Sequence, residues 1–316
     1  MLQTISRDVS KDIISGIAIT SIIFVISLYI PIIGFFCALF IPLPTLIYRS
    51  KLGRTTGTII PIIATIIMGI ILGGISIDIL FFFELLLLGF VLSELLELNL
   101  SIEKTILYAC GSVIVTGIIC LLFYSTIANK GIYALISEYV SKNLELTLSL
   151  YKNMGMKQES IQMISTSLEN IKYVFIRIIP ALVVVSTLFI SWTNLLLSKR
   201  IFKNWNLLYP DFGSLKLWRA PEVLVWIIIG CGILLLFQNK TFKIIGLNGL
   251  LILMTIYFFQ GIAIVSFYFE KKKLPRLLRF FLYSLIALQQ IVLICVIGLG
   301  FFDVWLNIRK LETNNK

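Results

Sequence analysis

Long apolar runs, separated by short polar turns, fill most of this chain. No charged residue occurs between Ile13 and Tyr48, and runs such as Ile59–Leu72 show no alternation of polar and apolar positions. A bilayer core about 30 Å thick takes about 20 apolar residues per helix, whereas a closed barrel in lipid would need alternating strands. The pattern therefore predicts an all-α fold, a polytopic helical membrane bundle.

The apolar runs predict eight or nine transmembrane helices. The first run is too long for one span, and Pro31 divides it into a helix near 13–29 and a shorter piece that ends near residue 44. This shorter piece is either a span or a re-entrant segment. The other spans are expected at 55–72, 77–96, 105–125, 173–197, 223–237, 244–269 and 280–302.

Residues 126–172 differ from the rest of the chain. Charges of both signs appear there, while apolar residues recur at helical spacing, first around Leu135 and Tyr139 and then from Ile161 to Ile171. This spacing is typical of amphipathic helices. We expect an amphipathic helical pair that lies on the membrane surface or caps the bundle, inserted into a single integral membrane domain over 1–316.

Composition agrees with a lipid environment. Hydrophobic residues make up 59% of the chain and charged residues 14%, against about 25% charged in a soluble domain. The net charge is +11, with five Lys or Arg residues in 199–219 and five in 271–279. Basic loops beside spans follow the positive-inside rule, so no nucleic acid partner is expected. The rule makes 198–222 a cytoplasmic loop and places 126–172 outside.

Little in the sequence indicates catalysis. The chain has no His, no phosphate-binding glycine motif and no metal-ligand spacing, and its five Cys residues lie in apolar runs. We therefore expect no enzyme activity, no metal and no cofactor. Ionisable groups inside membrane spans are costly and are candidates for function by default. The candidate ligand-binding residues are Glu84, Asp78, Arg177 and Asp303.

Each of these candidates has a structural alternative. Glu84 contacts either a ligand or ion in the bundle interior or, as a neutral acid, a hydrogen-bond partner on a neighbouring helix. Asp78 and Arg177 fall at the outer ends of their spans and are equally suited to form a structural ion pair. Gln260 is expected to hydrogen-bond between helices.

The segment Trp205–Trp226 is the long polar interruption in the second half of the chain. It contains three of the five Trp and two of the eight Pro residues. Such residues are ordinary interfacial anchors, but the mixture of aromatic and cationic side chains also suits the docking of a protein partner. The candidate interface residues are Trp218, Arg219, Pro221 and Trp226.

Several segments together resemble a known family. They are Leu150-Tyr151 with Gly155, Phe212 followed by Trp218-Arg219-Ala220-Pro221 and Trp226, and Gly300-Phe301-Phe302-Asp303-Val304-Trp305 with Arg309-Lys310. In order and spacing they resemble the YybS-like family of bacterial polytopic membrane proteins (domain of unknown function 2232). That family is in turn distantly similar to the substrate-binding membrane subunits of energy-coupling-factor transporters, which capture vitamins and metal ions from outside.

The resemblance implies a multi-pass protein of the bacterial inner membrane and a function in substrate capture or transport. Its pocket would open outward and be lined by the four ionisable candidates. The alternative is a non-enzymatic structural protein that scaffolds cell-envelope partners through Trp205–Trp226 and the amphipathic pair. The expected partners are thus the lipid bilayer, with either a small-molecule ligand or a membrane or cytoplasmic protein.

Overall fold

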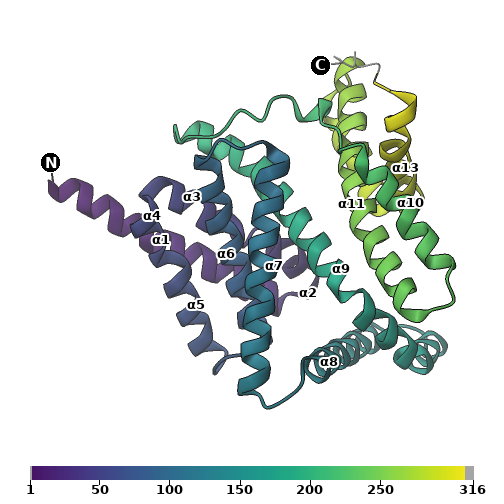
Figure 1. Cartoon of the computed structure of the whole chain (residues 1–316). Helices are drawn as coiled ribbons and strands as arrows, with labels where there is room; N and C mark the ends of the chain where they lie inside the picture. The colour runs from purple at the N-terminus through teal and green to yellow at the C-terminus, as the bar shows by residue number, and fades with distance from the viewer. Residues whose placement is uncertain (1, 310–316) are drawn as a thin grey trace. The chain divides into compact units, whose positions relative to one another are not determined.

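The computed structural model of the chain describes residues 2–309, without the side chains of residues 2–8, 31, 32 and 35. Lys310, the last residue of the C-terminal motif, lies outside this range. Within it every regular element is helical, which confirms the predicted fold class (Figure 1). The elements are α1 (Leu2–Tyr29), α2 (Pro31–Ala38), α3 (Pro42–Leu52), α4 (Arg54–Gly57), α5 (Ile59–Ile71), α6 (Ile77–Glu97), α7 (Ile102–Ile127), α8 (Ile132–Asn153), α9 (Gln158–Asn204), the 3-10 turn η1 (Leu215–Leu217), α10 (Val223–Leu236), α11 (Lys240–Lys271), α12 (Arg276–Leu288) and α13 (Gln290–Leu306).

Six helical segments in the described part of the chain are long and apolar enough to cross a membrane. They are Val9–Tyr29, Arg54–Ile71, Ile77–Glu97, Ile102–Ile127, Gln158–Asn204 and Lys240–Lys271. The pair α12 and α13 raises the number to seven if it counts as one span. The predicted eight or nine spans are not confirmed, because α2 and α10 have only 8 and 14 residues, fewer than the roughly 20 that a bilayer core requires.

Packing divides the chain into two compact units. Unit 1 comprises Met1–Leu168 and Ser186–Asp211, and unit 2 comprises Glu169–Val185 and Phe212–Lys316. Helix α9 contributes to both units. With 47 residues it is about 70 Å long. The second amphipathic pattern and the span predicted at 173–197 are therefore one continuous helix, where the sequence suggested two. The predicted single membrane domain stays a prediction.

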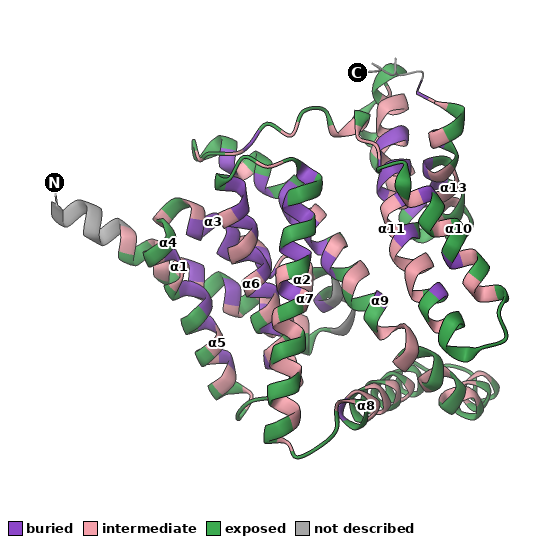
Figure 2. Cartoon of the chain, viewed as in Figure 1, coloured by how far each residue is buried: buried purple, intermediate pink, exposed green. Residues whose placement is uncertain are grey.

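In unit 1, short helices complete a bundle around α6. A Cβ atom at Gly89 of α6 would overlap the carbonyl of Pro42, so glycine permits α3 to approach closely. Arg49 of α3 is 1% exposed and forms ion pairs with Glu94 and Glu97 of α6. Figure 2 shows this buried interior, in contrast to the largely exposed surface of α8.

The chain returns along α1 in two short pieces. Helices α2 and α3 both pack against α1. Near the end of α3, the ammonium of Lys51 lies 2.7 Å from the carboxylate of Asp12, near the start of the membrane-spanning part of α1. The sequence left open whether the piece ending near residue 44 is a span or a re-entrant segment. In the structure, α2 and α3 together bring the chain back to the level of Asp12 on α1.

In unit 2, α11 packs against both α10 and α13 (Figure 1). Helices α11 and α13 touch backbone to backbone, because a Cβ at Gly261 would overlap the carbonyl of Val296, and one at Gly300 would overlap that of Tyr257. Small residues at such a crossing are the usual device for close packing in membranes.

The pair α12 and α13 differs from the straight span predicted at 280–302. The two helices are bent by 100° at Gln289, whose backbone is extended. The end of α13 lies beside the last turns of α11, since the Tyr268 hydroxyl donates to the Ile308 carbonyl at 2.7 Å. The chain therefore leaves α11 and returns to the same end of unit 2, which is the path of a re-entrant pair.

A side chain of α11 bonds the backbone of α9 on both sides of a proline. Pro180 has no N–H to donate to the carbonyl of Ile176, four residues earlier. The amide of Asn248, on α11, bonds two neighbouring backbone groups: its Nδ2 donates to the Arg177 carbonyl at 2.9 Å, and its Oδ1 accepts from Ala181 N–H at 2.9 Å. Asn248 thereby fixes this stretch of α9 to α11 within unit 2.

Candidate functional site

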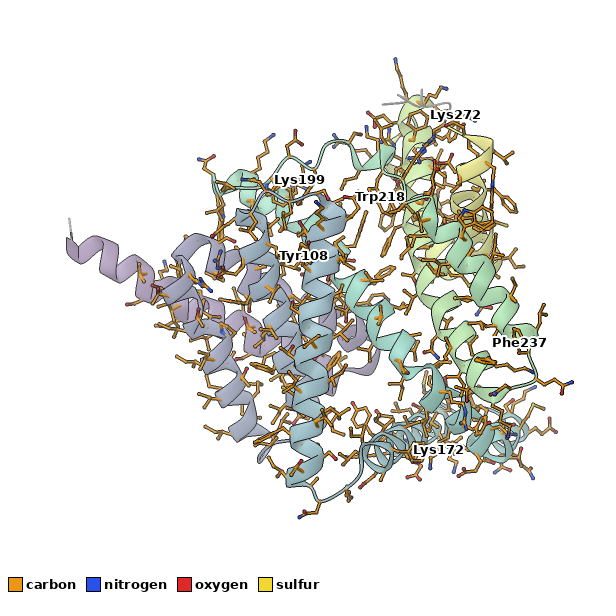
Figure 3. The ribbon with its side chains drawn as sticks, viewed as in Figure 1. Tyr108, Lys172, Lys199, Trp218, Phe237 and Lys272 are labelled. Carbon is orange, nitrogen blue, oxygen red and sulfur yellow. The ribbon has the colours of Figure 1, made fainter. Side chains whose placement is uncertain are left out.

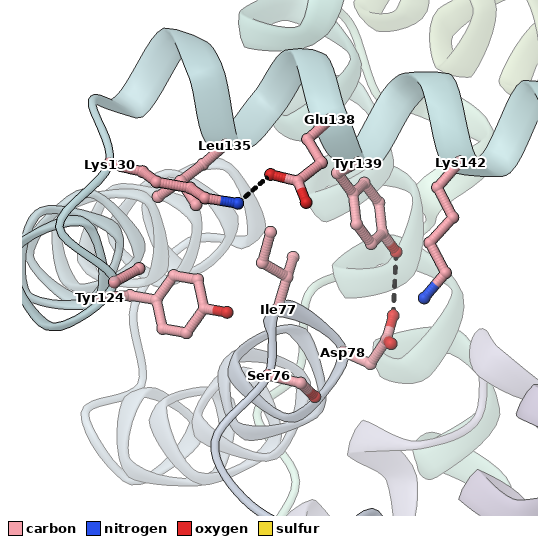
Figure 4. A pocket seen from close by; sticks show the side chains of 10 residues that line it. Ser76, Ile77, Asp78, Tyr124, Lys130, Leu135, Glu138, Tyr139 and Lys142 are labelled. Atoms are coloured by element: carbon pink, nitrogen blue, oxygen red, sulfur yellow. Dashed lines mark hydrogen bonds and ion pairs between the residues drawn. The ribbon is translucent and has the colours of Figure 1, made fainter.

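A cavity of about 370 Å³ lies in unit 1, where the start of α6, the end of α7 and the first turns of α8 meet. Figure 4 shows the side chains that surround it. They are Ser76, Ile77, Asp78, Tyr124, Ala128, Lys130, Leu135, Glu138, Tyr139 and Lys142. Of the four ligand-binding residues predicted from the sequence, the cavity contains Asp78.

Local sequence places Asp78 at the cavity. Gly73 and Gly74 have φ angles of 77° and 133°, which glycine adopts without strain, and they turn the chain between α5 and α6. Ser76 then caps α6, its hydroxyl accepting from Ile79 N–H at 3.3 Å. Asp78 falls in the first helical turn as a result. Across the cavity, Leu135 is 5% exposed and anchors α8.

The charges in the cavity are only partly paired. The hydroxyl of Tyr139 donates to Asp78 Oδ1 at 3.0 Å, and Lys130 Nζ lies 2.5 Å from Glu138 Oε2. No hydrogen bond or ion pair joins the Lys142 ammonium to another residue that the structure describes. Burial, together with the charge of Asp78, raises the pKa of Tyr139 to about 12. Tyr139 is therefore a donor at neutral pH, and the cavity offers both carboxylate and ammonium groups.

Glu84 lies deeper in α6 and does not line this cavity. It is six residues beyond Asp78, about 9 Å along the helix axis. Its Oε2 accepts from the Thr116 hydroxyl of α7 at 3.0 Å, and the Cys120 thiol is the other polar group beside the carboxyl. These contacts fit the hydrogen bond to a neighbouring helix that the sequence offered as one alternative. A ligand-binding role for Glu84 stays a prediction.

Arg177 belongs to unit 2 and Asp78 to unit 1. The Arg177 guanidinium lies over the ring of Tyr173, 3.2 Å from its centre, and donates to the Tyr173 carbonyl at 2.8 Å. Arg177 is thus held by its own helix, and the ion pair with Asp78 stays a prediction.

Asp303, the fourth candidate, is the centre of a buried polar cluster in unit 2. Its carboxylate is fully buried and accepts from Arg309 Nη2 at 2.8 Å, from Gln260 Nε2 at 3.2 Å and from the backbone N–H of Ile308 at 2.9 Å. Gln260 joins α11 to α13, as expected of an interhelical hydrogen bond. With its oxygens occupied by protein donors, Asp303 is suited to a structural role, and its binding of a ligand stays untested.

The same cluster holds the segment around Trp218. Arg309 Nη1 donates to the carbonyls of Lys216 and Trp218, at 2.7 and 3.0 Å. Arg219 lies beside Asp303, with Nε to Oδ2 at 3.8 Å, and donates to the Asn307 side chain.

The four predicted interface residues therefore fall into two groups. Trp218 and Arg219 have partners inside unit 2, through Arg309 and Asp303. Pro221 and Trp226 are exposed, and Trp226 is 74% exposed. A role in docking a protein is untested for all four.

Sequence reasoning did not assign Lys130, Lys142 or Arg309 to a site. Lys130 and Lys142 were read only as charges of the amphipathic insertion, although they face the start of α6. Arg309 follows Asp303 by six residues, and this spacing across a helix end was the available signal for their pairing. Nothing in the sequence shows that α8 folds back over Asp78.

The comparisons with known proteins agree with this helical architecture. The family model described as "Predicted membrane protein (DUF2232)" matches residues 18–304. "Uncharacterized protein YybS" of Bacillus subtilis (strain 168) is 23% identical over 309 residues, covering 93% of this chain and 95% of the relative. No solved structure matches the chain significantly. Since the family model covers most of the length, the chain belongs to the DUF2232 family of membrane proteins.

Proposed function

We propose that this chain is a non-enzymatic substrate-capture or transport component of the bacterial cell membrane, and that its ligand binds in the Asp78 cavity. The observation that supports the proposal is the placement of the Asp78 carboxylate and the unpartnered Lys142 in one open cavity of about 370 Å³. This volume lies in the range of about 300–1,000 Å³ that is usual for small-molecule sites.

The charges indicate the class of ligand. An ammonium group on the ligand would bind Asp78, and a carboxylate on the same ligand would bind Lys142. A small zwitterion of the amino-acid type satisfies both charges at once, whereas a metal ion alone would leave Lys142 unpaired. The aromatic ring of Tyr124 and the side chain of Ile77 give the cavity an apolar wall for the rest of such a ligand.

Thermal unfolding of the purified protein tests the proposal. The panel contains amino acids and other small zwitterions, with vitamins, nucleobases and metal ions for comparison. A ligand at 100 times its Kd should stabilise the folded protein by about 2.7 kcal/mol. Asp78→Asn and Lys142→Gln should remove that stabilisation. Glu84→Gln is the matched control, since it changes another carboxyl of α6 outside the cavity, and it should keep the stabilisation.

Two results would overturn the proposal. One is the absence of stabilisation by every zwitterion in the panel. The other is a ligand whose stabilisation is the same in Asp78→Asn, in Lys142→Gln and in the unchanged protein. Binding lost in Glu84→Gln alone would transfer the site to the deeper position on α6.

A scaffolding role for cell-envelope partners is the second candidate. The exposure of Trp226, at the first turn of α10, is the observation that favours it. A photo-crosslinking residue at position 226 in intact cells shows whether this side chain lies beside a protein or beside lipid. A discrete protein adduct supports the scaffolding role, whereas adducts with lipid alone refute it at this position.

A further inference from the structure

Cations are concentrated where the chain turns from α11 to α12. Lys271, Lys272, Lys273 and Arg276 are all exposed and lie within six residues of one another. The nearest acid, Glu270, does not neutralise them, because it pairs with Lys216. In the described part of the chain, no ion pair engages Lys272, Lys273 or Arg276. The turn therefore presents a concentrated positive charge without a protein partner.

An apolar surface begins directly after these cations. Leu277 is 83%, Phe280 75% and Phe281 60% exposed. Two polar side chains of α12 are directed toward α11 and the turn: the Tyr283 hydroxyl lies 2.7 Å from that of Ser266, and Arg279 Nε donates to the Leu274 carbonyl at 2.9 Å. Helix α12 thus shows an apolar face whose first turn lies beside the exposed cations.

The position of the turn agrees with a membrane interface. Figure 3 shows Lys272 and Trp218 toward the same end of unit 2, with Phe237 toward the other. Arg309 also belongs to this end, since it binds the Trp218 carbonyl. Tryptophan and basic side chains at one level are typical of the boundary between headgroups and acyl chains.

We propose that the turn between α11 and α12 binds an anionic phospholipid. The headgroup phosphate contacts Lys272, Lys273 and Arg276, and the acyl chains lie along Leu277 and Phe280. An acidic soluble protein or a nucleic acid would complement the charges but would leave the adjoining apolar face uncovered. Only a lipid has a negatively charged headgroup directly followed by hydrocarbon, which matches the cations of the turn followed by the apolar face of α12.

Native mass spectrometry of the full-length protein in detergent tests the proposal, with phosphatidylglycerol and phosphatidylcholine as probes. The unchanged protein should retain phosphatidylglycerol in preference to phosphatidylcholine. Each cation near a membrane surface is worth about fivefold in binding. The triple variant Lys272→Gln, Lys273→Gln, Arg276→Gln should therefore lower the affinity for phosphatidylglycerol about a hundredfold. Its unfolding temperature without added lipid should be unchanged, since these side chains have no partner to lose.

The matched control removes three other exposed cations that lack ion pairs among the described residues. Lys199→Gln, Arg200→Gln and Lys203→Gln change the net charge equally at the end of α9, and the control should lose less than about twofold in affinity. Equal losses in the two triple variants would show a general charge effect and overturn the site. Retention of phosphatidylcholine equal to that of phosphatidylglycerol would also overturn it, as would tight binding of glycerol phosphate without acyl chains.

Discussion

Removal of the Asp303 carboxylate should destabilise unit 2 severely. The side chains of Asp303 and Arg309 are both fully buried, and Asp303 is the acid nearest to Arg309 among the described residues. In Asp303→Ala the guanidinium would keep only the carbonyls of Lys216 and Trp218. A buried cation whose counter-ion is removed costs far more than an exposed one, because water cannot replace the lost partner.

The magnitude follows from this burial. Breaking a buried pair by removing one partner costs about 3–5 kcal/mol, and Gln260 and Ile308 N–H would also lose their acceptor. Asp303→Asn should cost less, since its amide oxygen still accepts one of these bonds. The double replacement Asp303→Leu with Arg309→Met should recover most of the loss, because it leaves no buried charge. Glu270→Gln is the control: its pair with Lys216 is exposed and worth at most about 1 kcal/mol.

Two measurements of the detergent-solubilised protein check this reasoning. Denaturant titration gives the loss of unfolding free energy for each variant. Limited trypsin digestion reports on the segment itself, because Lys216 and Arg219 become cleavable once Arg309 no longer holds it. Wild-type stability and wild-type protection in Asp303→Ala would refute the inference that the cluster holds this segment. So would a double variant as unstable as the single one, because the cost would then not come from an unpaired charge.

Three further outcomes are expected. In a cysteine-free background, a thiol at Gln158 should be labelled from outside intact cells and one at Lys272 should not, because basic loops stay inside; the reverse pattern contradicts the orientation. Asn248→Leu should cost at least about 2 kcal/mol in a denaturant titration, as two backbone groups lose their partners, whereas the same change at exposed Asn239 should cost under about 1 kcal/mol. The absorbance of the Tyr139 phenolate, taken as the difference between the unchanged protein and Tyr139→Phe, should appear near pH 12. Because this pKa is raised on folding, any stability from the bond to Asp78 persists below about pH 10. That stability disappears as the pH rises through the pKa of the folded protein. Appearance of that absorbance already near pH 10 would contradict the burial and the hydrogen bond of Tyr139.

The helical class could be predicted from the sequence because, in lipid, every backbone N–H and C=O group of a span must find a partner within the protein. Runs of about 20 apolar residues leave a helix as the simplest way to satisfy the backbone. The number of spans was harder to predict, because it depends on breaks that hydropathy does not mark. The 100° bend at Gln289 and the short α2 both interrupt apolar sequence. At Pro180 the opposite happens: the helix continues through a proline, and Asn248 bonds backbone groups on either side of it.

The candidate site was predictable only in part. Asp78 could be proposed because ionisable groups in membrane spans are candidates for function by default, although a structural ion pair explained it equally well. Its cavity partners come from α8, about 60 residues away, and their approach depends on the anchoring of Leu135. Long-range packing of this kind leaves no periodic signal in one chain. The four predicted residues were expected to share one pocket, but two of them, Arg177 and Asp303, belong to a different unit from Asp78 and Glu84.

The segments that carry the family resemblance explain why it indicates architecture better than activity. The Trp218-Arg219-Ala220-Pro221 segment and the stretch from Gly300 to Arg309 contact each other through Arg309 and the Trp218 carbonyl. Both also contact α11, the first through Ala220 N–H and Gln260 and the second through Gly300 and Tyr257. These contacts hold the loop around Trp218 against the helices α11 and α13. The open cavity with an unpartnered cation lies outside these segments. A search for the ligand should therefore begin at Asp78 and Lys142, while variants of the motif residues should be read first for stability.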